Sequence, residues 1–370
     1  MCYGTEKSVA KKRKEVCFDC LAMLFRVTVI NKIIEEKSMK RLFSMILTLT
    51  VFLLSMIPMC QYSSAISTRN SSITYTNEEL DLSQYTLDDL FEMSSYEYRN
   101  LVREFERVYD PFGSYDPTEA AQDDLEASNG DAELQWTSGK IVDGEYTDDG
   151  THEYITTVAC EILSNDRGAI GSSVVEGVAV VLSISLASLL PDKDEWFPGF
   201  NGHFFDPNTG KNYTGSSSNT AKTNAQEHYD AAVTAANSGD MNEAYEQIGR
   251  CLHYIQDASE PHHASNVVSY GSLSPHAKFE KYAYGKREVC LMDYTTIGSS
   301  YYTTAINSTV SSMVIGAATI AKAKIGMVND TSDQSQWYSV CTSSLKCAAR
   351  YSAMVLYKFS RLSSVPFVSN

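Results

Sequence analysis

The histidines of this chain are confined to one part of its sequence. All 7 lie within residues 152–276 of a chain of 370 residues. His253, His262 and His263 fall close together, in the segment His-Tyr-Ile-Gln-Asp-Ala-Ser-Glu-Pro-His-His-Ala-Ser-Asn. A single histidine is commonly a surface or satisfied core residue, whereas imidazole is the commonest metal ligand in proteins. The clustering therefore needs an explanation beyond the ordinary one for a single histidine, and it indicates a candidate metal site.

The residues before this cluster have the composition and spacing of two helices. Apolar residues recur at helical intervals through 221–255, and a Ser-Gly-Asp sequence at 238–240 interrupts them. His253 and Asp257 are four residues apart, so they share one face of the second helix. An imidazole and a carboxylate placed in this way can bind a single metal ion.

A second pair of the same kind follows a turn. Pro261 cannot continue a helix, which lets His263 approach a neighbouring ion from another direction, and His276 and Glu280 again stand four residues apart. Nitrogen and oxygen ligands without a thiolate suit Zn²⁺ in a hydrolytic site. Because the ligands outnumber those of one tetrahedral ion, we expect a multinuclear site, whose natural chemistry is displacement at a phosphoryl ester.

Five sequence blocks in order resemble the signature of the bacterial zinc-dependent phospholipases C, the family of clostridial alpha-toxin and the phosphatidylcholine-preferring Bacillus enzyme. The blocks are Trp-Thr-Ser-Gly-Lys-Ile, Gly-Thr-His-Glu-Tyr-Ile, Gly-His-Phe-Phe-Asp-Pro-Asn, His-Tyr-Ile-Gln-Asp-x-x-x-Pro-x-His-x-x-Asn and His-x-x-x-Glu. They occupy residues 136–141, 150–155, 202–208, 253–266 and 276–280. The resemblance covers about 136–370, which we interpret as the catalytic domain.

The resemblance implies an all-α fold: a helical bundle with a trinuclear zinc cleft, of the type that zinc-dependent phospholipases C share with single-strand nucleases. Amphipathic patterns agree with it and predict helices at 152–165, 168–190, 219–237, 241–257, 302–327 and 335–361. The apolar stretch 172–190 is short for a membrane span and contains Glu176, so we expect a buried helix there.

The resemblance also implies how this sequence would hold three zinc ions. The first ion would be bound by Asp192, His203, His253 and Asp257. The second would be bound by His263, His276 and Glu280. The third would be bound by His152, by Asp257 as a bridge, and by the amino group and carbonyl of Trp136.

The assignments of Asp192 and Trp136 are the two that the sequence leaves open. The loop that contains Asp192 also offers Asp194, which is the alternative ligand, and Asp192 is in addition the expected general base for an attacking water. The spacer between Trp136 and His152 is longer than in the family and carries an acidic insertion. By the family pattern His262 is not a ligand, and His228 is interpreted as a residue on the surface of a helix.

The implied reaction is hydrolysis of the glycerol–phosphate bond of phospholipids at a membrane surface, which leaves diacylglycerol and a phosphorylated head group. The alternatives are a single-strand nuclease on the same fold or a zinc-binding protein without catalysis. Glu260 before Pro261, and Glu280 as the last ligand, favour the phospholipase. A net charge of -16 argues against a nucleic-acid partner, and we expect a monomer.

The first part of the chain reads as a leader and a pro-segment. Residues 39–65 contain a basic start, an uncharged apolar run at 42–59 and a small-residue exit, which is typical of a signal peptide for secretion. Residues 1–38 are interpreted as an over-called extension of the start. Residues 66–135 carry 4 basic and 17 acidic side chains, a composition that argues against an independent core.

The acidic segment allows two interpretations, a solvated linker and a pro-segment removed after export. Because Trp136 would supply a terminal amine to the third ion, we expect a processing protease to cleave at Gln135–Trp136. Of the 9 cysteines in the chain, five follow this point, and they are interpreted as core thiols with room for one disulfide.

Overall fold

The computed structural model describes residues 80–113, 150–168, 170–171, 174–195, 199–269 and 273–362. All of these residues belong to one unit of the chain, residues 73–370. The expected extension at 1–38 and the expected signal peptide at 39–65 lie outside the described residues, and so does Trp136. The fold and the site are therefore built from the helices that follow residue 80.

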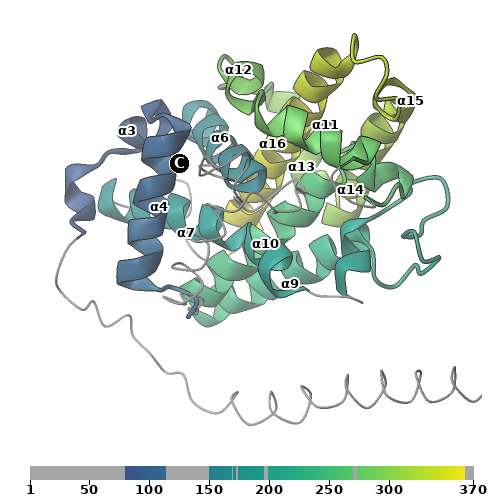
Figure 1. Ribbon diagram of the computed structural model, residues 1–370. Coiled ribbons are helices and arrows are strands. Elements are labelled where there is room, and N and C mark those ends of the chain that lie inside the picture. Colours follow the sequence, from purple (N-terminus) through teal and green to yellow (C-terminus); the bar gives the residue numbers. More distant parts are fainter. Residues whose placement is uncertain are drawn as a thin grey trace, which may run out of the picture. The chain divides into compact units, whose positions relative to one another are not determined.

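The described part of the chain is helical (Figure 1). Its elements are η1 (Leu82–Gln84), α3 (Leu87–Glu92), α4 (Ser95–Tyr109), α6 (Thr151–Arg167), α7 (Val174–Ala187), α8 (Leu190–Asp194), η2 (Gly199–His203), α9 (Ala221–Ser238), α10 (Met241–Asp257), η3 (His263–Ser265), α11 (Pro275–Tyr284), α12 (Arg287–Leu291), α13 (Ser299–Asn307), α14 (Val310–Lys322), α15 (Ile325–Val328) and α16 (Trp337–Leu362). No β-strand occurs among these residues, and an isolated β-bridge joins Asp206 to Lys211. The predicted all-α fold class is confirmed.

Helix periodicity predicted α6, α9, α10 and α16 close to their observed bounds, but the single helix predicted over 302–327 is wrong. That stretch forms α13, α14 and α15. Ser308 has an extended backbone, and the side chain of Thr309 accepts the N–H of Ser312 at 3.1 Å, which caps a new helix. A side-chain cap of this kind satisfies backbone donors that a continuous helix would have used internally. The apolar periodicity continues across residues 308 and 309, although the helix ends there and a new one begins at the cap.

Helix α10 is the element around which the others pack. It contacts α9, α7, α16 and α6, and residues Cys251–Asp257 at its C-terminal end are all buried. Gly249 allows the close approach of α7, because a Cβ atom there would lie 2.4 Å from Cβ of Ala187 and 2.7 Å from the carbonyl oxygen of Ile184. The polar end of α10 is thus inserted into the interior rather than exposed to water.

The break predicted between the two helices of 221–255 is confirmed and has a defined geometry. Gly239 ends α9 with φ of 85°, a left-handed conformation that favours glycine. Asp240 then caps α10 by accepting the N–H of Glu243 at 3.2 Å. This tight turn places α9 and α10 side by side, which fixes the direction in which α10 enters the core.

The apolar stretch around α7 is buried in the protein, as expected. Val178, Val181, Leu182 and Ile184 are each inaccessible to solvent. Within the described ranges, no helix combines the length and the apolar character that a membrane span requires. Helix α7 lies between α10 on one side and residues 80–113 on another, so its apolar surface is covered by other helices.

Candidate metal centre

Helix geometry brings together the first two polar groups of the centre. His253 and Asp257 lie one turn apart near the end of α10, with Nε2 of the histidine 3.2 Å from Oδ2 of the aspartate. Both side chains are buried. The pair predicted from the sequence spacing therefore exists, and it points into the protein.

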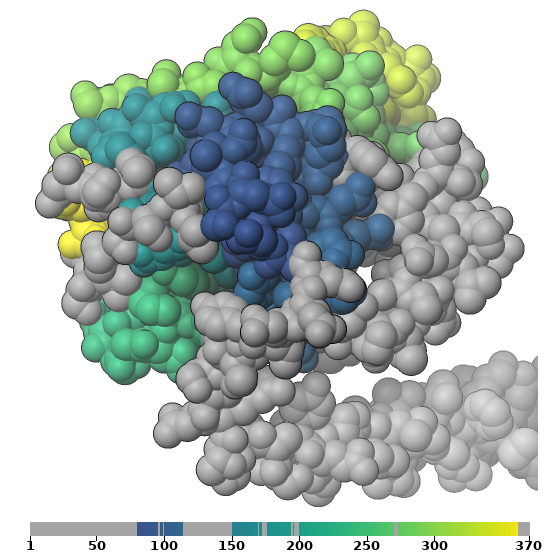
Figure 2. Space-filling model, turned by 90° about the vertical axis from the view of Figure 1, so that its left-hand side faces the viewer, coloured from purple at the N-terminus to yellow at the C-terminus, as the bar shows by residue number. Residues whose placement is uncertain are grey.

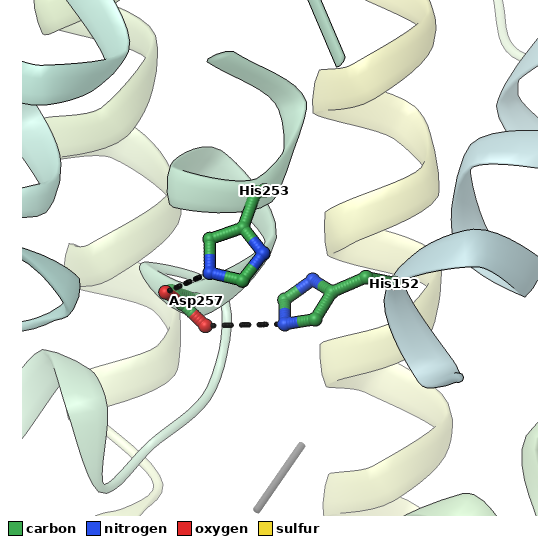
Figure 3. Close-up of side chains that lie close together, drawn as sticks. All are labelled: His152, His253 and Asp257. Carbon is green, nitrogen blue, oxygen red and sulfur yellow. Dashed lines mark ion pairs between the residues drawn. The ribbon is translucent and has the colours of Figure 1, made fainter. Parts of the chain in front are cut away.

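His152 approaches this pair from a different helix. It stands at the start of α6, where Gly150 donates its N–H to the Glu153 carboxylate at 3.3 Å. Nε2 of His152 lies 3.4 Å from Oδ1 of Asp257, as Figure 3 shows. The rings of His152 and His253 are 4.0 Å apart between centroids. These three residues form the first of three groups that have the spacing of metal ligands.

Asp192 and His203 complete a second group around His253. Asp192 comes from the short helix α8, and His203 ends η2. Oδ1 of Asp192 lies 3.6 Å from Nε2 of His253 and 3.8 Å from Nδ1 of His203. Nδ1 of His203 is also 2.9 Å from Oδ2 of Asp257. Asp192 therefore reaches the centre, and the side chain of Asp194, the alternative ligand, lies outside the described part of the chain.

A third group forms beyond the Pro261 turn. His276 and Glu280 share a face of α11, with Nε2 and Oε1 2.9 Å apart. Nε2 of His263 lies 3.2 Å from the same carboxylate oxygen. Glu260, whose Oε2 lies 4.0 Å from Nε2 of His276, is the carboxylate that has the spacing of a metal ligand together with His263 and His276. Nδ1 of His263 is in addition 3.6 Å from Oδ1 of Asp257, so the third group adjoins the first two.

Protein oxygens orient several of these imidazoles. Nδ1 of His253 lies 2.9 Å from the carbonyl oxygen of Ser188, and Nδ1 of His263 lies 3.1 Å from that of His203. Because a carbonyl oxygen only accepts hydrogen bonds, each Nδ1 carries a proton, and in the neutral ring this leaves the lone pair of Nε2 available for a metal ion. Such outer contacts fix the tautomer and the ring orientation of metal ligands.

Gln256 does the same for His152. Its amide nitrogen donates to Oγ1 of Thr156 at 2.9 Å and to Oγ of Ser352 at 3.2 Å, which leaves its oxygen 2.8 Å from Nδ1 of His152. The amide is fully buried. It links α10 to both α6 and α16 and directs Nε2 of His152 towards Asp257.

The spacing of the donor atoms is better explained by binding of a divalent cation than by hydrogen bonds among the side chains. Nε2 of His253 and Nδ1 of His203 are only 2.9 Å apart, and both lie near Oδ2 of Asp257. One shared proton cannot satisfy all of these atoms. Zn²⁺ with bonds of about 2.0–2.1 Å would place tetrahedral ligand atoms roughly 3.3 Å apart, which is close to the spacing observed.

Two buried carboxylate oxygens support the same conclusion. Oδ2 of Asp192 and Oε2 of Glu280 make no hydrogen bond to any residue that the structure describes. Nε2 of His152 lies 3.9 Å from Oδ2 of Asp192, which is too far for a hydrogen bond. A buried charged oxygen without a hydrogen bond is costly, and metal coordination would satisfy it. The nitrogen and oxygen donor set, without a cysteine, is compatible with Zn²⁺.

The electrostatics of the centre keep its carboxylates ionised. Burial alone would raise the pKa of Asp257, but the neighbouring His253 and His263 hold it well below its usual value. Burial also opposes ionisation of Glu280, yet the charges and hydrogen bonds of His276 and His263 lower its pKa to about 2. Metal ligands must be deprotonated, so these carboxylates are in the form that binds a cation.

Three polar residues of the centre were not expected from the sequence. Glu260 accepts the backbone N–H of His263 at 2.7 Å and lies 2.7 Å from Nδ1 of His262. Glu195 lies 3.6 Å from Nε2 of His203 and accepts a hydrogen bond from Tyr254. Gln256 is the third. For Gln256 the one available signal was its place beside Asp257 on a helix, and that place does not reveal which neighbour the side chain reaches.

Three further residues considered in the sequence do not appear in the three groups, for different reasons. His262 is buried and paired with Glu260, and His228 is half-buried with Nδ1 2.6 Å from Oε1 of Gln247; neither belongs to the three groups. Trp136 lies outside the described residues. The structure brings the other eight predicted side chains together, and their role as zinc ligands stays a prediction.

Known proteins resemble this chain over part of its length, although no protein-family model matches it. A Phospholipase C from Clostridium haemolyticum is 32% identical over 160 residues, which cover 40% of this chain and 40% of that protein. A Phospholipase C from Bacillus cereus is 27% identical over 158 residues, which cover 42% of this chain and 53% of that protein. The structure of alpha toxin from Clostridium absonum matches with a TM-score of 0.50 and 22% identity, and covers 60% of this chain and 65% of that one.

These comparisons confirm the resemblance to the bacterial phospholipases C that the sequence blocks indicated. The aligned regions span between 40% and 53% of the length of these two curated relatives. The likeness to the solved structure shows a shared fold. The reaction of the whole protein is therefore a matter for proposal and test.

Proposed function

We propose that this chain, a relative of the bacterial phospholipases C, is a zinc metallohydrolase that cleaves the glycerol–phosphate bond of phospholipids. The products would be diacylglycerol and a phosphorylated head group. One observation carries the proposal: Asp257 joins three neighbouring imidazole–carboxylate groups in a buried centre. Its support from homology is that curated relatives are named Phospholipase C.

The three groups suggest which residues would hold three zinc ions. Asp192, His203, His253 and Asp257 would hold the first, and His263, His276 and Glu280 the second. His152, Asp257 and the amino end of Trp136 would hold the third. The contact of Glu260 with the second group suggests that it orients His263 rather than serving as the main ligand, because its two oxygens already accept hydrogen bonds at 2.7 Å.

The chemistry of such a centre is nucleophilic displacement at phosphorus. Bound Zn²⁺ would supply Lewis acidity that makes water a nucleophile at neutral pH and neutralises charge on the phosphate oxygens. Asp192 is the proposed general base, since it borders His203 and His253 and its side chain keeps a 10% exposed fraction. From this position it would orient the attacking water and accept its proton.

We also propose that residues 66–135 act as a pro-segment. A peptide nitrogen between Gln135 and Trp136 has a delocalised lone pair, so it cannot bind zinc as a free amine can. Cleavage there would create an α-amine with a pKa near ~8 and complete the third set of ligands. Amino-terminal sequencing of active enzyme should then detect a new amino terminus at Trp136, and full activity from uncleaved 66–370 with three bound zinc ions would exclude this step.

Export and the monomeric state belong to the same proposal. A signal peptide at 39–65 would deliver the protein outside the cell, where phospholipid surfaces are its substrate. The catalytic part, residues 136–370, carries 24 acidic and 16 basic side chains, which suits zwitterionic lipid better than strongly anionic membranes. Analytical ultracentrifugation of the secreted protein tests the monomer.

An activity panel tests the reaction itself. The secreted protein, with its zinc content measured, is assayed on phosphatidylcholine, phosphatidylethanolamine, sphingomyelin and single-stranded DNA. The proposal predicts phosphorylated head groups from at least one lipid, no mononucleotides, and loss of activity on chelation with recovery on zinc addition. Nucleotide release without lipid cleavage would assign the chain to the nucleases, and zinc binding without either activity would make it a non-catalytic protein.

A further inference from the structure

The sequence segment that reads as an acidic linker or pro-segment is in part a piece of the folded body. We infer that residues 80–113 are a built-in partner for the face of α7 and α8, and that they stay bound to it after the chain is cut between 113 and 136. The consequence drawn below for Asp192 rests on the proposed metal centre, whereas the docking itself does not.

The segment first specifies its own helices. Thr86 and Asp89 form a reciprocal cap at the start of α3, with N–H to side-chain distances of 2.7 and 3.1 Å. Ser94 and Glu97 repeat this arrangement at the start of α4, at 3.1 and 3.3 Å. Such capping boxes satisfy backbone donors at a helix start. Two acidic side chains of the segment, Asp89 and Glu97, therefore serve helix formation.

The helices then bury one face in the core of the body. Six apolar side chains of the segment belong to the same hydrophobic cluster as those of α6, α7 and α10: Leu82, Leu90, Tyr98, Leu101, Val102 and Phe105. Val102 is completely inaccessible to solvent. The elements η1, α3 and α4 all contact α7, and α3 also contacts α6. Figure 2 shows the surface of this segment, in blue, directly against the teal surface of the helices that follow.

Polar contacts join the same surfaces. The hydroxyl of Tyr98 donates to Oγ of Ser185 at 2.9 Å in the interior. Glu106, which is 7% exposed, forms an ion pair at 3.4 Å with Lys193. A hydroxyl or carboxylate buried without partners is costly, so these contacts favour one position of α4 on α7 over sliding. A solvated linker would show neither the burial nor the pairing.

One partner of this ion pair, Lys193, lies next in the chain to a residue of the candidate metal centre. Lys193 belongs to α8, a helix of five residues, and directly follows Asp192. The other neighbours of α8 in the chain are the C-terminal end of α7 and Glu195, which lies 3.6 Å from His203. Loss of α4 would therefore uncover α7 and free one side of the helix that carries Asp192.

Controlled cleavage of the intact protein tests the docking. A specific protease site is placed within residues 118–130 of the exported chain, the protein is cut, and the products are separated by gel filtration. We expect the two fragments to elute together and to separate only in denaturant. Separation of the wild-type fragments in buffer, with an unchanged melting temperature of the larger one, would overturn the inference and leave a removable pro-segment.

Matched variants locate the contact. Val102→Asp puts a carboxylate on the buried face of α4, and Asn100→Asp puts the same group on its exposed face. We expect the first to release the fragment after cleavage and the second to leave it bound. Tyr98→Phe, which removes only the hydroxyl, covers the case in which Val102→Asp does not fold, and it should speed fragment release. Equal release from all three variants would contradict the proposed surface.

Zinc content distinguishes this inference from the proposed function. If the docking is correct and the metal centre is also correct, forced removal of 80–113 should lower the zinc content per chain. If the metal centre is wrong, the fragments should still elute together, because the docking needs neither zinc nor activity.

A different observation carries a second proposal, which concerns two thiols far along the chain. We propose that Cys290 and Cys341 form a disulfide under oxidising conditions. Their sulfur atoms lie 3.7 Å apart, both residues are buried, and the helices that carry them, α12 and α16, are packed together. A disulfide bond is about 2.05 Å long, so modest side-chain movement closes the gap. Cys160, Cys251 and Cys347 have no sulfur partner of this kind among the described residues.

The reaction is thiol–disulfide exchange with an external disulfide such as oxidised glutathione. The Cys290 thiolate attacks one external sulfur and forms a mixed disulfide, which releases the other sulfur as a thiolate. Cys341 then loses its proton, attacks the sulfur of Cys290 and displaces the second external thiolate. Two electrons pass to the external disulfide, which leaves as two thiols. The hydrogen bond from Cys341 lowers the pKa of Cys290 to about 6, which favours the attacking thiolate.

Alkylation followed by peptide mass spectrometry tests this pair. The protein is incubated with oxidised glutathione, denatured without reductant and alkylated. We expect Cys290 and Cys341 to resist alkylation and to be recovered in linked peptides that lack two hydrogens. Cys290→Ser should make Cys341 reactive, whereas Cys251→Ser should leave the pair protected. Alkylation of both cysteines in the oxidised wild-type protein would reject the disulfide.

Discussion

Oδ1 of Asp257 lies 3.4 Å from Nε2 of His152, although the two residues come from α10 and α6. The second oxygen of the same carboxylate faces His203 and His253 at 2.9 and 3.2 Å. One side chain therefore belongs to two neighbouring groups. A carboxylate with both oxygens so engaged is suited to bridge two ions, and we therefore expect Asp257 to be the most sensitive position of the centre.

We predict that Asp257→Asn lowers turnover by more than about 100-fold and lowers the zinc content per chain, since changes even beside metal ligands commonly cost about 10–100-fold. The amide keeps the size of the side chain but loses the negative charge that a bridge needs. Asp230→Asn, on the exposed face of α9, is the control and should change stability by no more than ~0.5 kcal/mol. Normal zinc content and rate in Asp257→Asn would mean that this carboxylate is not a bridge.

His263→Ala should remove an ion from the group beyond the Pro261 turn and abolish turnover. The ion is lost because the variant lacks the nitrogen that lies 3.2 Å from Glu280. Inductively coupled plasma mass spectrometry on purified protein measures the zinc content per chain. His228→Ala removes a half-buried imidazole bonded to Gln247 and should keep both the metal and the rate. If the two variants behave alike, the third group is not a metal site.

Gln256→Leu should weaken zinc binding by about 10–100-fold without unfolding the protein. The leucine removes the oxygen that lies 2.8 Å from Nδ1 of His152, so the imidazole loses the contact that directs Nε2 to the centre. Competition with a zinc chelator measures the affinity. Gln247→Leu on the same helix is the matched control, and Gln256→Glu, which keeps an acceptor oxygen, should lose less affinity than the leucine variant.

Gly249→Ala should destabilise the fold by about 1–3 kcal/mol, because an added methyl group overpacks a close contact. A Cβ atom there would lie 2.4 Å from Cβ of Ala187, so α7 and α10 must move apart. Gly326→Ala meets no atom within 4 Å and should leave stability unchanged or slightly raised. Urea denaturation of both variants tests the close packing of α7 on α10, and equal midpoints would contradict it.

Several features of the fold follow from local sequence alone. The periodicity of apolar residues defines α10, and the Gly239 turn before it requires a residue that tolerates positive φ. The spacing of His253 and Asp257, like that of His276 and Glu280, places each pair on one helix face. These features depend on interactions between residues close together in the chain, so they can be predicted from the sequence. The single helix predicted over 302–327 failed because the Thr309 cap competes locally with the same periodicity.

The sequence by itself determined the helices α6, α9, α10 and α16, the two ligand pairs and the family that the chain resembles. Only the tertiary structure decided that Asp192 reaches His203 and His253, and that Gln256 orients His152. It also decided that residues 80–113, whose charge suggested a solvated segment, cover α7. The physical reason is that side-chain contacts between distant segments depend on how helices pack, and neither net charge nor helical spacing specifies which faces will meet.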